Sequence, residues 1–287
     1  MSESFRVSVA INTYNEEKNI ANAIESVPFA DEIIIVDMYS SDRTVEIAKR
    51  YSNVKVFNFE PCGYADPARQ YAIEQVSNDW VMVLDADELV TPVLWNELKR
   101  VVENDLADVV QIPRVNYMFG EKIICGGWAK DTVLRFFKKS SIIGYSARVH
   151  SDFYQFPADV RKIFLDIPEA SILHFNYLGI EHFIDKMNKY TTIEAAEMFK
   201  GQRGIPKAKH IIKDCLWFIP RFMWKSGGRK NGWTGLALAV LMLTYKISTF
   251  IKYKLMTKYS SSLYQDEIYK EYQVIASKVI NGYKTKE

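Results

Sequence analysis

Residues 81–90 read VMVLDADELV. The four apolar residues are typical of a strand buried on both faces, and they run directly into Asp85, Asp87 and Glu88. Carboxylates this close together repel one another unless a cation or hydrogen-bond donors offset their charge. The stretch therefore indicates either a metal site at the end of a buried strand or, if the acids only begin the next helix or face solvent, an ordinary loop.

Strands and helices are predicted to alternate through the first part of the chain. Stretches rich in Val, Ile and Phe and bounded by polar residues predict strands at 5–12, 31–38, 54–59 and 80–87. Helical patterns lie between and after them, at 20–27, 42–51, 65–76 and 92–104. Thr91 is the expected N-cap of the last helix, with Pro92 in its first turn. This alternation predicts an α/β fold with right-handed crossovers and a mostly parallel, Rossmann-like sheet flanked by helices.

Several polar residues follow the predicted strands at their carboxyl ends, the edge of an α/β sheet at which ligands bind. Asp85 and Asp87 follow the fourth strand, Asp37 ends the second, and residues 12–16 follow the first. Carboxylate oxygens suit Mg²⁺ or Mn²⁺, which usually bind one or two carboxylates together with substrate phosphates. The pattern predicts a divalent cation and a phosphate-bearing ligand at this edge.

Four motifs occur in order: INTYNEEKNI (11–20), IIIVDMYSSDRT (33–44), YADPARQYA (64–72) and DAD (85–87). Together they resemble the family 2 glycosyltransferases of the GT-A fold. Three later stretches, GGWAKDTVLRFFKK (126–139), ARVHSDF (147–153) and ILHFNYLGIEHFIDKMNKYT (172–191), resemble the bacterial subgroup that adds hexoses to lipopolysaccharide or lipooligosaccharide core. This subgroup, of the beta-1,4-glucosyltransferase type, implies transfer of a hexose from a UDP-sugar, UDP-glucose first among them, to a glycan or lipid-linked saccharide acceptor.

The resemblance implies a uracil pocket at the end of the first strand. Asn12, Thr13 and Tyr14 would line it, with Tyr14 stacking on the base and Glu16 in the same motif. Asp37 would accept a hydrogen bond from the base N–H. Many members have proline where this chain has Asn12. For Tyr14 the alternative is a ring that only covers the edge of the sheet.

The resemblance also places the ribose and the phosphates. Asp85 would contact the ribose, with Ala86 beside it, and Arg69 would approach the nucleotide or its phosphates. Asp87 would ligate the Mg²⁺ or Mn²⁺ ion that bridges the two phosphates, with His174 as the late histidine near the metal. The alternatives are that Arg69 pairs with Asp66 or Glu74 on its own helix, and that His174 is a core histidine bonded to a backbone carbonyl.

An inverting transferase also needs a general base that takes the proton from the acceptor hydroxyl. Two carboxylates compete for this role. Asp152 follows a Val-His pair, where the subgroup usually has an acid, although Ser151 intervenes here. Asp131 is the second possibility and could instead orient Arg135. We favour Asp152.

The segment 201–258 carries 12 lysines and arginines against one acid, Asp214, so its net charge is +11 in a chain whose total is +2. Its longest apolar run, between Trp233 and Tyr245, has 13 uncharged residues and is shorter than the about 20 that span a bilayer. Tryptophans interleaved with lysines predict helices that lie on an anionic membrane surface; ordinary core helices with a solvated basic face are the alternative. Without a nucleic-acid-binding motif, nucleic acid is not an expected partner.

The N-terminus, MSESFRVSVAIN, lacks the basic and apolar regions of a signal peptide, and the three cysteines have no paired spacing. We therefore expect a cytoplasmic protein, peripheral on the inner face of the cell membrane. Three parts are predicted: a nucleotide-sugar-binding half at 1–116, an acceptor-binding half at 117–200, and a basic amphipathic helical extension at 201–287.

Two other functions would leave different signs in the sequence. A non-catalytic relative could keep the fold as a nucleotide-sugar-binding or scaffolding module at the membrane surface, but the intact DAD motif and Asp37 argue for the enzyme. A nucleotidyltransferase would need a glycine-rich phosphate loop after the first strand, and TYNEEKNI contains no glycine.

Overall fold

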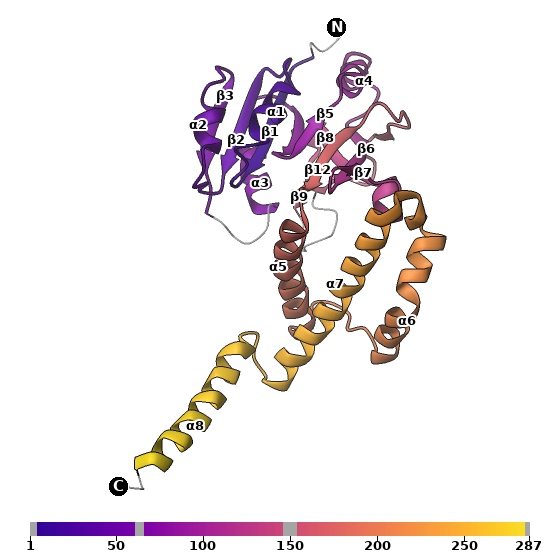
Figure 1. Cartoon of the computed structure of the whole chain (residues 1–287). Helices are drawn as coiled ribbons and strands as arrows, with labels where there is room; N and C mark the ends of the chain where they lie inside the picture. The colour runs from indigo at the N-terminus through magenta and orange to yellow at the C-terminus, as the bar shows by residue number, and fades with distance from the viewer. Residues whose placement is uncertain (1–4, 61–65, 146–153, 285–287) are drawn as a thin grey trace. The chain divides into compact units, whose positions relative to one another are not determined.

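The computed structural model describes residues 5–60, 66–145 and 154–284. The chain divides into two compact units (Figure 1). The sheet unit comprises Met1–Ile123 and Gly127–Asn176, and the helical unit comprises Ile124–Gly126 and Tyr177–Glu287. The candidate active site is built within the sheet unit.

The first four strands of the sheet unit are parallel and lie in the order β3-β2-β1-β4. Their bounds are β1 (Val7–Thr13), β2 (Glu32–Asp37), β3 (Val54–Asn58) and β4 (Trp80–Asp85). The helices that follow them are α1 (Ile20–Glu25), α2 (Thr44–Ala48), α3 (Asp66–Gln75) and α4 (Pro92–Glu103). These elements confirm the predicted alternation, and the strand order changes direction between β1 and β4, the kind of switch point at which α/β sheets bind ligands.

Beyond β4 the sheet is mixed and continues in the order β4-β8-β6-β12-β5. The remaining strands are β5 (Glu88–Val90), β6 (Val109–Met118), β7 (Glu121–Lys122), β8 (Thr132–Lys138), β11 (Lys162–Phe164) and β12 (Ile172–Tyr177), with a separate pair of β9 (Gly144–Tyr145) and β10 (Tyr154–Gln155). Two short 3-10 helices, η1 (Gly126–Lys130) and η2 (Lys139–Ser141), flank β8. Because β8 runs antiparallel to both β4 and β6, the parallel order expected from the sequence holds only for the first half of the sheet.

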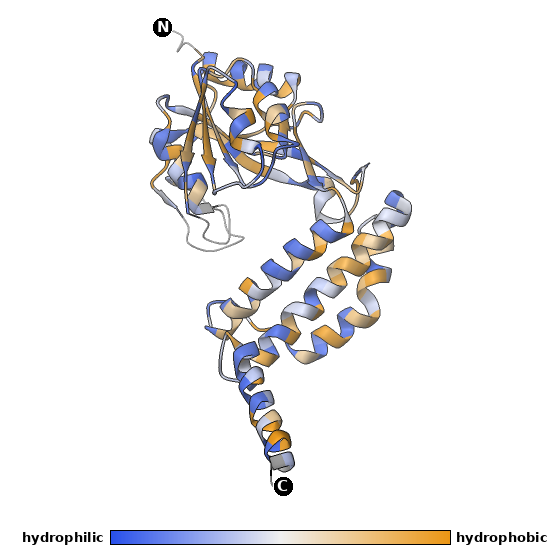
Figure 2. Cartoon of the chain, turned by 60° about the vertical axis from the view of Figure 1, so that its left-hand side comes forward, coloured by the Kyte–Doolittle hydropathy of each residue, from blue (hydrophilic) through white to orange (hydrophobic). Residues whose placement is uncertain are grey.

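The stretch VMVL of β4 is buried on both faces, as its composition predicts. Val81 and Val83 pack into the core cluster that includes α3, while Met82 and Leu84 pack into the one formed with α1 and α4. Successive side chains of a strand point to opposite faces, so a strand covered by helices on both sides is apolar throughout. In Figure 2, which colours the chain by hydropathy, the strands of the sheet are largely orange, the colour of apolar residues.

The start of α4 confirms the predicted cap. Thr91 accepts a hydrogen bond from the backbone N–H of Leu94 at 3.3 Å, and Pro92 occupies the first turn. The Thr91 hydroxyl also donates to the carbonyl of Glu169 at 2.7 Å. The helix start is therefore tied to the segment that leads into β12.

The helical unit contains α5 (Ile180–Phe199), α6 (Ala208–Lys225), η3 (Gly228–Asn231), α7 (Gly232–Lys258) and α8 (Tyr264–Lys284). Helix α7 packs against both α5 and α6. Its first turn approaches η3 so closely that a Cβ on Gly235 would lie 1.9 Å from the carbonyl oxygen of Gly228. Glycine is therefore required at position 235, because any side chain would push the two segments apart.

Helix α7 corrects one expectation. The 13 uncharged residues were expected to be too short to span a bilayer, but they belong to a helix of 27 residues. The segment 228–258 is long and apolar enough to cross a membrane by length and composition, and 28% of its most apolar 18-residue window is buried. Core helices of soluble proteins share this length and composition.

Candidate active site

The loops after β1 and β2 form one hydrogen-bonded rim. The backbone N–H of Asn15 donates to the Ser40 hydroxyl at 2.8 Å, and the Asn15 side-chain oxygen accepts from the N–H of Ser41 at 2.8 Å. The N–H of Glu17 donates to Asp42 at 3.0 Å. Asn15 has a φ of +56°, a left-handed conformation that asparagine tolerates better than most residues. The two loops therefore support each other at the carboxyl edge of the sheet.

Asn12 and Thr13 lie at this edge, where β1 pairs Asn12 with Asp85 and Thr13 with Asp37. The Asn12 amide donates to Asp85 at 3.1 Å. Its oxygen Oδ1 and the Thr13 hydroxyl are buried, and neither has a hydrogen-bond partner among the described residues. Buried polar atoms are rarely left unpaired, so these two are available to a ligand. Tyr14, the expected stacking residue, is 53% exposed.

Asp37 and Glu16 both have partners within the rim. The Asp37 carboxylate accepts from the Ser40 hydroxyl at 2.5 Å and from the Ser40 N–H at 2.9 Å. Glu16 accepts from the Asn19 side chain at 2.7 Å, and its own N–H donates to Thr44 at 2.8 Å. Both acids therefore shape the loops, whatever they contribute to a ligand.

Asp85 is held between two arginines. Arg69 Nη2 lies 2.6 Å and 2.8 Å from its two carboxylate oxygens, and Arg135 Nη2 lies 2.7 Å from Oδ2. Burial alone would raise the pKa of Asp85, but the two guanidiniums hold that pKa well below its usual range. The Arg69 guanidinium therefore reaches from α3 across to β4.

Glu88 is also neutralised. Its side chain is fully buried, and its oxygens accept from Arg114 Nη1 at 2.9 Å and from the backbone N–H of Asp85 at 3.0 Å. Arg135 Nη2 lies 3.7 Å away. Arg135 therefore pairs with Asp85 and Glu88, whereas Asp131, which could have oriented Arg135, accepts from Arg114 and Asn116.

Asp87, the second acid of VMVLDADELV, faces a histidine instead of an arginine. His174 Nε2 lies 3.5 Å from Asp87 Oδ2, and both residues are buried, with 8% and 9% of their surfaces exposed. The other ring nitrogen, Nδ1, lies 2.7 Å from the side-chain oxygen of Asn116, so the alternative of a histidine bonded to a backbone carbonyl is not what is seen. The acids therefore differ in role: Asp85 and Glu88 pair with arginines, and Asp87 remains beside an imidazole.

The donor atoms of Asp87 and His174 fit a divalent cation. Among the described residues no group of three or more His, Cys, Asp or Glu side chains gathers into a metal site. Two protein ligands nevertheless suffice for Mg²⁺ or Mn²⁺ when phosphate oxygens and water supply the others. An imidazole and a carboxylate oxygen are both suitable ligands.

Asp131 is engaged on one oxygen by two donors, Arg114 Nε and Asn116 Nδ2, each at 2.8 Å. Asp152, the favoured base, and His150 lie outside the described residues. Arg114 and Asn116 were not among the residues predicted from the sequence. They lie two residues apart on β6 and so share one face of the strand. Polar residues at this spacing in an apolar strand were the signal that could have identified them.

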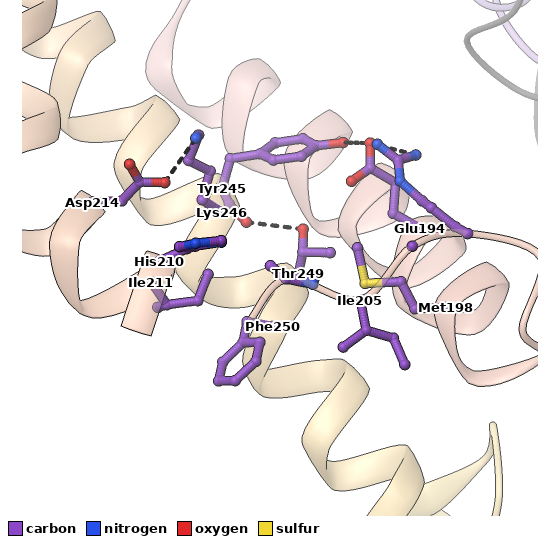
Figure 3. Close-up of a pocket in the computed structure, with 13 residues that line it drawn as sticks. Glu194, Met198, Ile205, His210, Ile211, Asp214, Tyr245, Lys246, Thr249 and Phe250 are labelled. Atoms are coloured by element: carbon purple, nitrogen blue, oxygen red, sulfur yellow. Dashed lines mark hydrogen bonds and ion pairs between the residues drawn. The ribbon is translucent and has the colours of Figure 1, made fainter. Parts of the chain in front are cut away.

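The helical unit holds a pocket of about 340 Å³ between α5, α6, α7 and the segment 203–206 (Figure 3). Tyr245 donates to Glu194 at 2.9 Å, and burial together with that carboxylate raises the pKa of Tyr245. Lys246 binds Asp214 at 2.9 Å, and Arg203 lies 3.3 Å from Glu194. The charged groups that line the pocket are thus paired with one another, and none of the predicted site residues lies there.

Comparisons with known proteins identify the family of the chain. The family model described as glycosyl transferase family 2 matches residues 8–161. The chain is 30% identical over 227 residues to the uncharacterized glycosyltransferase RP128 of Rickettsia prowazekii, covering 76% of each protein. It is 26% identical over 260 residues to LpsC, a lipopolysaccharide core biosynthesis glycosyltransferase of Rhizobium meliloti, covering 86% of this chain and 91% of LpsC. The crystal structure of S. aureus TarS 1–349 in complex with UDP is 16% identical, with a TM-score of 0.46, over 89% of this chain and 91% of that one.

Proposed function

The chain belongs to glycosyl transferase family 2, whose model covers more than half of it, and from this premise we propose that it is an inverting, metal-dependent hexosyltransferase. The donor is a UDP-sugar, with UDP-glucose as the first choice. The acceptor is a glycan or a lipid-linked saccharide such as lipopolysaccharide core. The name of LpsC, which aligns with 86% of this chain, supports that acceptor class.

One observation carries the proposal: the three acids of VMVLDADELV have different partners. Asp85 and Glu88 are paired with arginines, whereas Asp87 lies 3.5 Å from the imidazole of His174. A purely structural acid cluster would need every carboxylate neutralised by the protein. Asp87 and His174 would instead hold Mg²⁺ or Mn²⁺, which stabilises the charge of a departing diphosphate when bound.

The other residues of the edge bind and orient the donor. Asn12 and Thr13, whose side-chain oxygens have no partner among the described residues, line the uracil pocket, and Tyr14 stacks on the base. Asp37 accepts from the base, while Glu16 keeps the loop in place. Arg69 and Arg135 keep Asp85 ionised and fixed in orientation, beside Ala86, so that its remaining acceptor capacity meets the ribose.

We assign the proton transfer from the acceptor hydroxyl to a carboxylate general base. We keep Asp152 in this role and give Asp131 a structural one, because Asp131 already accepts from Arg114 and Asn116. We place donor binding in residues 1–116, acceptor binding in 117–200 and membrane association in 201–287.

Membrane association is proposed from the surface of the helical unit. Trp217, Trp224 and Trp233 are 61%, 68% and 78% exposed, and the segment 201–258 carries its net charge of +11 around them. Exposed tryptophans and basic side chains are the groups that hold a protein in the interface of an anionic bilayer. We therefore locate the enzyme in the cytoplasm, peripheral on the inner face of the cell membrane.

A calorimetric titration with UDP, with and without Mn²⁺, tests the donor assignment and separates the enzyme from a non-catalytic relative. We expect UDP binding that Mn²⁺ strengthens at least tenfold, because the ion links the diphosphate to the protein. A UDP affinity that is the same with and without Mn²⁺ would favour the non-catalytic nucleotide-sugar-binding module. Asp79, which caps the segment 139–140 away from this edge, provides an Asp79→Asn control that should titrate as the wild type.

A further inference from the structure

We propose that Asn116 is a positioning residue that fixes the tautomer of His174, so that Nε2 presents its lone pair toward Asp87. Only the binding of a cation by this lone pair rests on the proposed function. The tautomer itself is a property of the protein alone. Asn116 is fully buried on β6, and neither the sequence motifs nor the family match gives it a role.

The orientation of the Asn116 amide follows from its neighbours. On one side Asp131 accepts from Asn116 at 2.8 Å, and the same carboxylate oxygen accepts from Arg114 Nε at 2.8 Å. An ionised carboxylate can only accept, so the Asn116 group that faces Asp131 must be its NH₂. The amide oxygen then points the other way, toward His174.

The proton on His174 follows in turn. The Asn116 oxygen lies 2.7 Å from His174 Nδ1 and can only accept, so Nδ1 must carry the hydrogen. In a neutral imidazole Nε2 is then unprotonated. The 3.5 Å separation between Nε2 and Asp87 Oδ2 is longer than an ordinary N–H···O bond, as expected for two electron-rich atoms without a proton between them.

Two such atoms at this separation are suited to share a cation, and an outer partner that orients a histidine ligand is a common feature of metal sites. The contacts among Arg114, Asp131, Asn116 and His174 form one series. Arg114 holds its outer end in place, because it binds both Asp131 and Glu88. Asp131 thus acts through Asn116 and not on the acceptor, which gives the carboxylate a role other than the general base.

The experiment reads the ring nitrogens by two-bond ¹⁵N–¹H correlation NMR at pH 8 in metal-free protein. The chain has four histidines, and His174→Asn assigns the signal. We expect the Nδ1–H tautomer for His174 in the wild type. An Nε2–H tautomer, or a doubly protonated ring at this pH, overturns the proposal.

Two variants test the cause. Asn116→Leu removes the acceptor and is expected to lose the Nδ1–H preference. Asp131→Asn, an isosteric change, lets the neighbouring amide turn either way and is expected to give a mixture of both tautomers. The matched control is Gln111→Leu, an amide-to-leucine change on the same strand that breaks a 2.7 Å hydrogen bond to Thr132 outside this series. A His174 signal unchanged in Asn116→Leu contradicts the proposal.

Mn²⁺ binding in the presence of UDP, measured by the EPR signal of free Mn²⁺, gives the second readout. Asn116→Leu should weaken it about 10–100-fold, the usual cost of removing an outer partner of a metal ligand. Gln111→Leu should bind Mn²⁺ like the wild type. If the wild type shows the Nδ1–H tautomer but binds neither UDP nor Mn²⁺, the proposed function fails while the tautomer assignment stands. Wild-type Mn²⁺ affinity in Asn116→Leu refutes the positioning role.

Discussion

Arg69 of α3 and Asp85 at the end of β4 form an ion pair in which one guanidinium nitrogen lies 2.6 Å and 2.8 Å from the two carboxylate oxygens. The pair joins a helix on one face of the sheet to the edge at which β1 and β4 meet. Asp85 also binds Arg135 and Asn12, so this one carboxylate ties together α3, β8 and β1.

Arg69→Met is expected to lower the free energy of unfolding by about 3 kcal/mol. Breaking a buried ion pair usually costs about 3–5 kcal/mol, and the lower end applies because this pair is only partly buried and Arg135 still neutralises Asp85. Urea denaturation measures the change. Arg43→Met is the control, since Arg43 binds Glu46 on the surface and its loss should change stability little. Equal effects of the two substitutions would show that the Asp85 pair is no more important than a surface pair.

Glu32 predicts a pH dependence. Burial alone would raise its pKa, but hydrogen bonds from the Ser77 N–H, Ser8, Lys55 and the Ser77 hydroxyl lower it to about 2. A depressed folded-state pKa stabilises the protein fully above the unfolded value of about 4.3 and loses that stabilisation as pH falls toward the folded value.

Glu32→Gln keeps an acceptor but removes the ionisation. The stability difference between wild type and variant should therefore be constant from about pH 7 to pH 5 and should shrink below pH 4, as followed by urea denaturation across this range. Curves that remain parallel down to pH 2 would mean that Glu32 does not titrate with folding.

Asp152→Asn is expected to lower kcat by about 10²–10⁴-fold while leaving UDP-sugar affinity nearly unchanged, because a base acts on the acceptor proton in the transition state. Steady-state kinetics with the acceptor saturating, together with calorimetry of the donor, measures both quantities. The same variant at Asp131 is the comparison. If Asp131→Asn shows this loss of kcat with Mn²⁺ affinity like the wild type, and Asp152→Asn stays active, the two assignments must be exchanged.

The basic helical segment predicts salt-sensitive membrane binding. Replacing Lys225, Arg229 and Lys230 with glutamine should release much of the protein from anionic vesicles and leave UDP binding unchanged, because the nucleotide site belongs to the sheet unit. Wild-type binding should weaken between 0.1 M and 1 M salt, where the Debye length falls from about 10 Å to about 3 Å. The exposed tryptophans should leave a salt-resistant remainder.

Sedimentation with anionic and neutral vesicles at both salt concentrations tests this prediction. Equal recovery in the supernatant under every condition would mean that the segment is an ordinary solvated face. Binding that survives 1 M salt and the triple substitution unchanged would instead point to insertion of α7, which is long and apolar enough to span a bilayer.

The sequence predicted the parallel half of the fold well, because each of its elements carries a local signal. The four N-terminal strands are rich in Val, Ile and Phe, α1 shows helical spacing, and Thr91 with Pro92 begins α4 as expected. The antiparallel half was not predicted in detail. The order of β8, β6 and β12 depends on long-range pairing, for which a single sequence carries no comparable signal.

The motifs predicted which side chains gather at the edge of the sheet, but they did not predict which ion pairs form there. The rim residues Asn12, Thr13, Asp37 and Asp85 come together because they end neighbouring parallel strands. Arg135 of β8 pairs with Asp85, and Arg114 of β6 pairs with Glu88, so both ion pairs join residues far apart in the sequence. Sequence spacing could therefore not show which acid each arginine neutralises. Without those pairings the three acids of VMVLDADELV could not be told apart.

The assignment of Asp87 as the carboxylate that holds the metal for a departing diphosphate is tested most directly by turnover. Wild type and Asp87→Asn are incubated with a panel of UDP-hexoses, with Mn²⁺ or with EDTA, and UDP release and sugar transfer are followed by mass spectrometry. We predict release by the wild type with Mn²⁺ only, and less than about a tenth of that rate in a folded Asp87→Asn, a barrier increase above about 1.4 kcal/mol. An Asp87→Asn variant that keeps more than about a tenth of the rate, or wild-type turnover that EDTA leaves unchanged, would contradict the assignment.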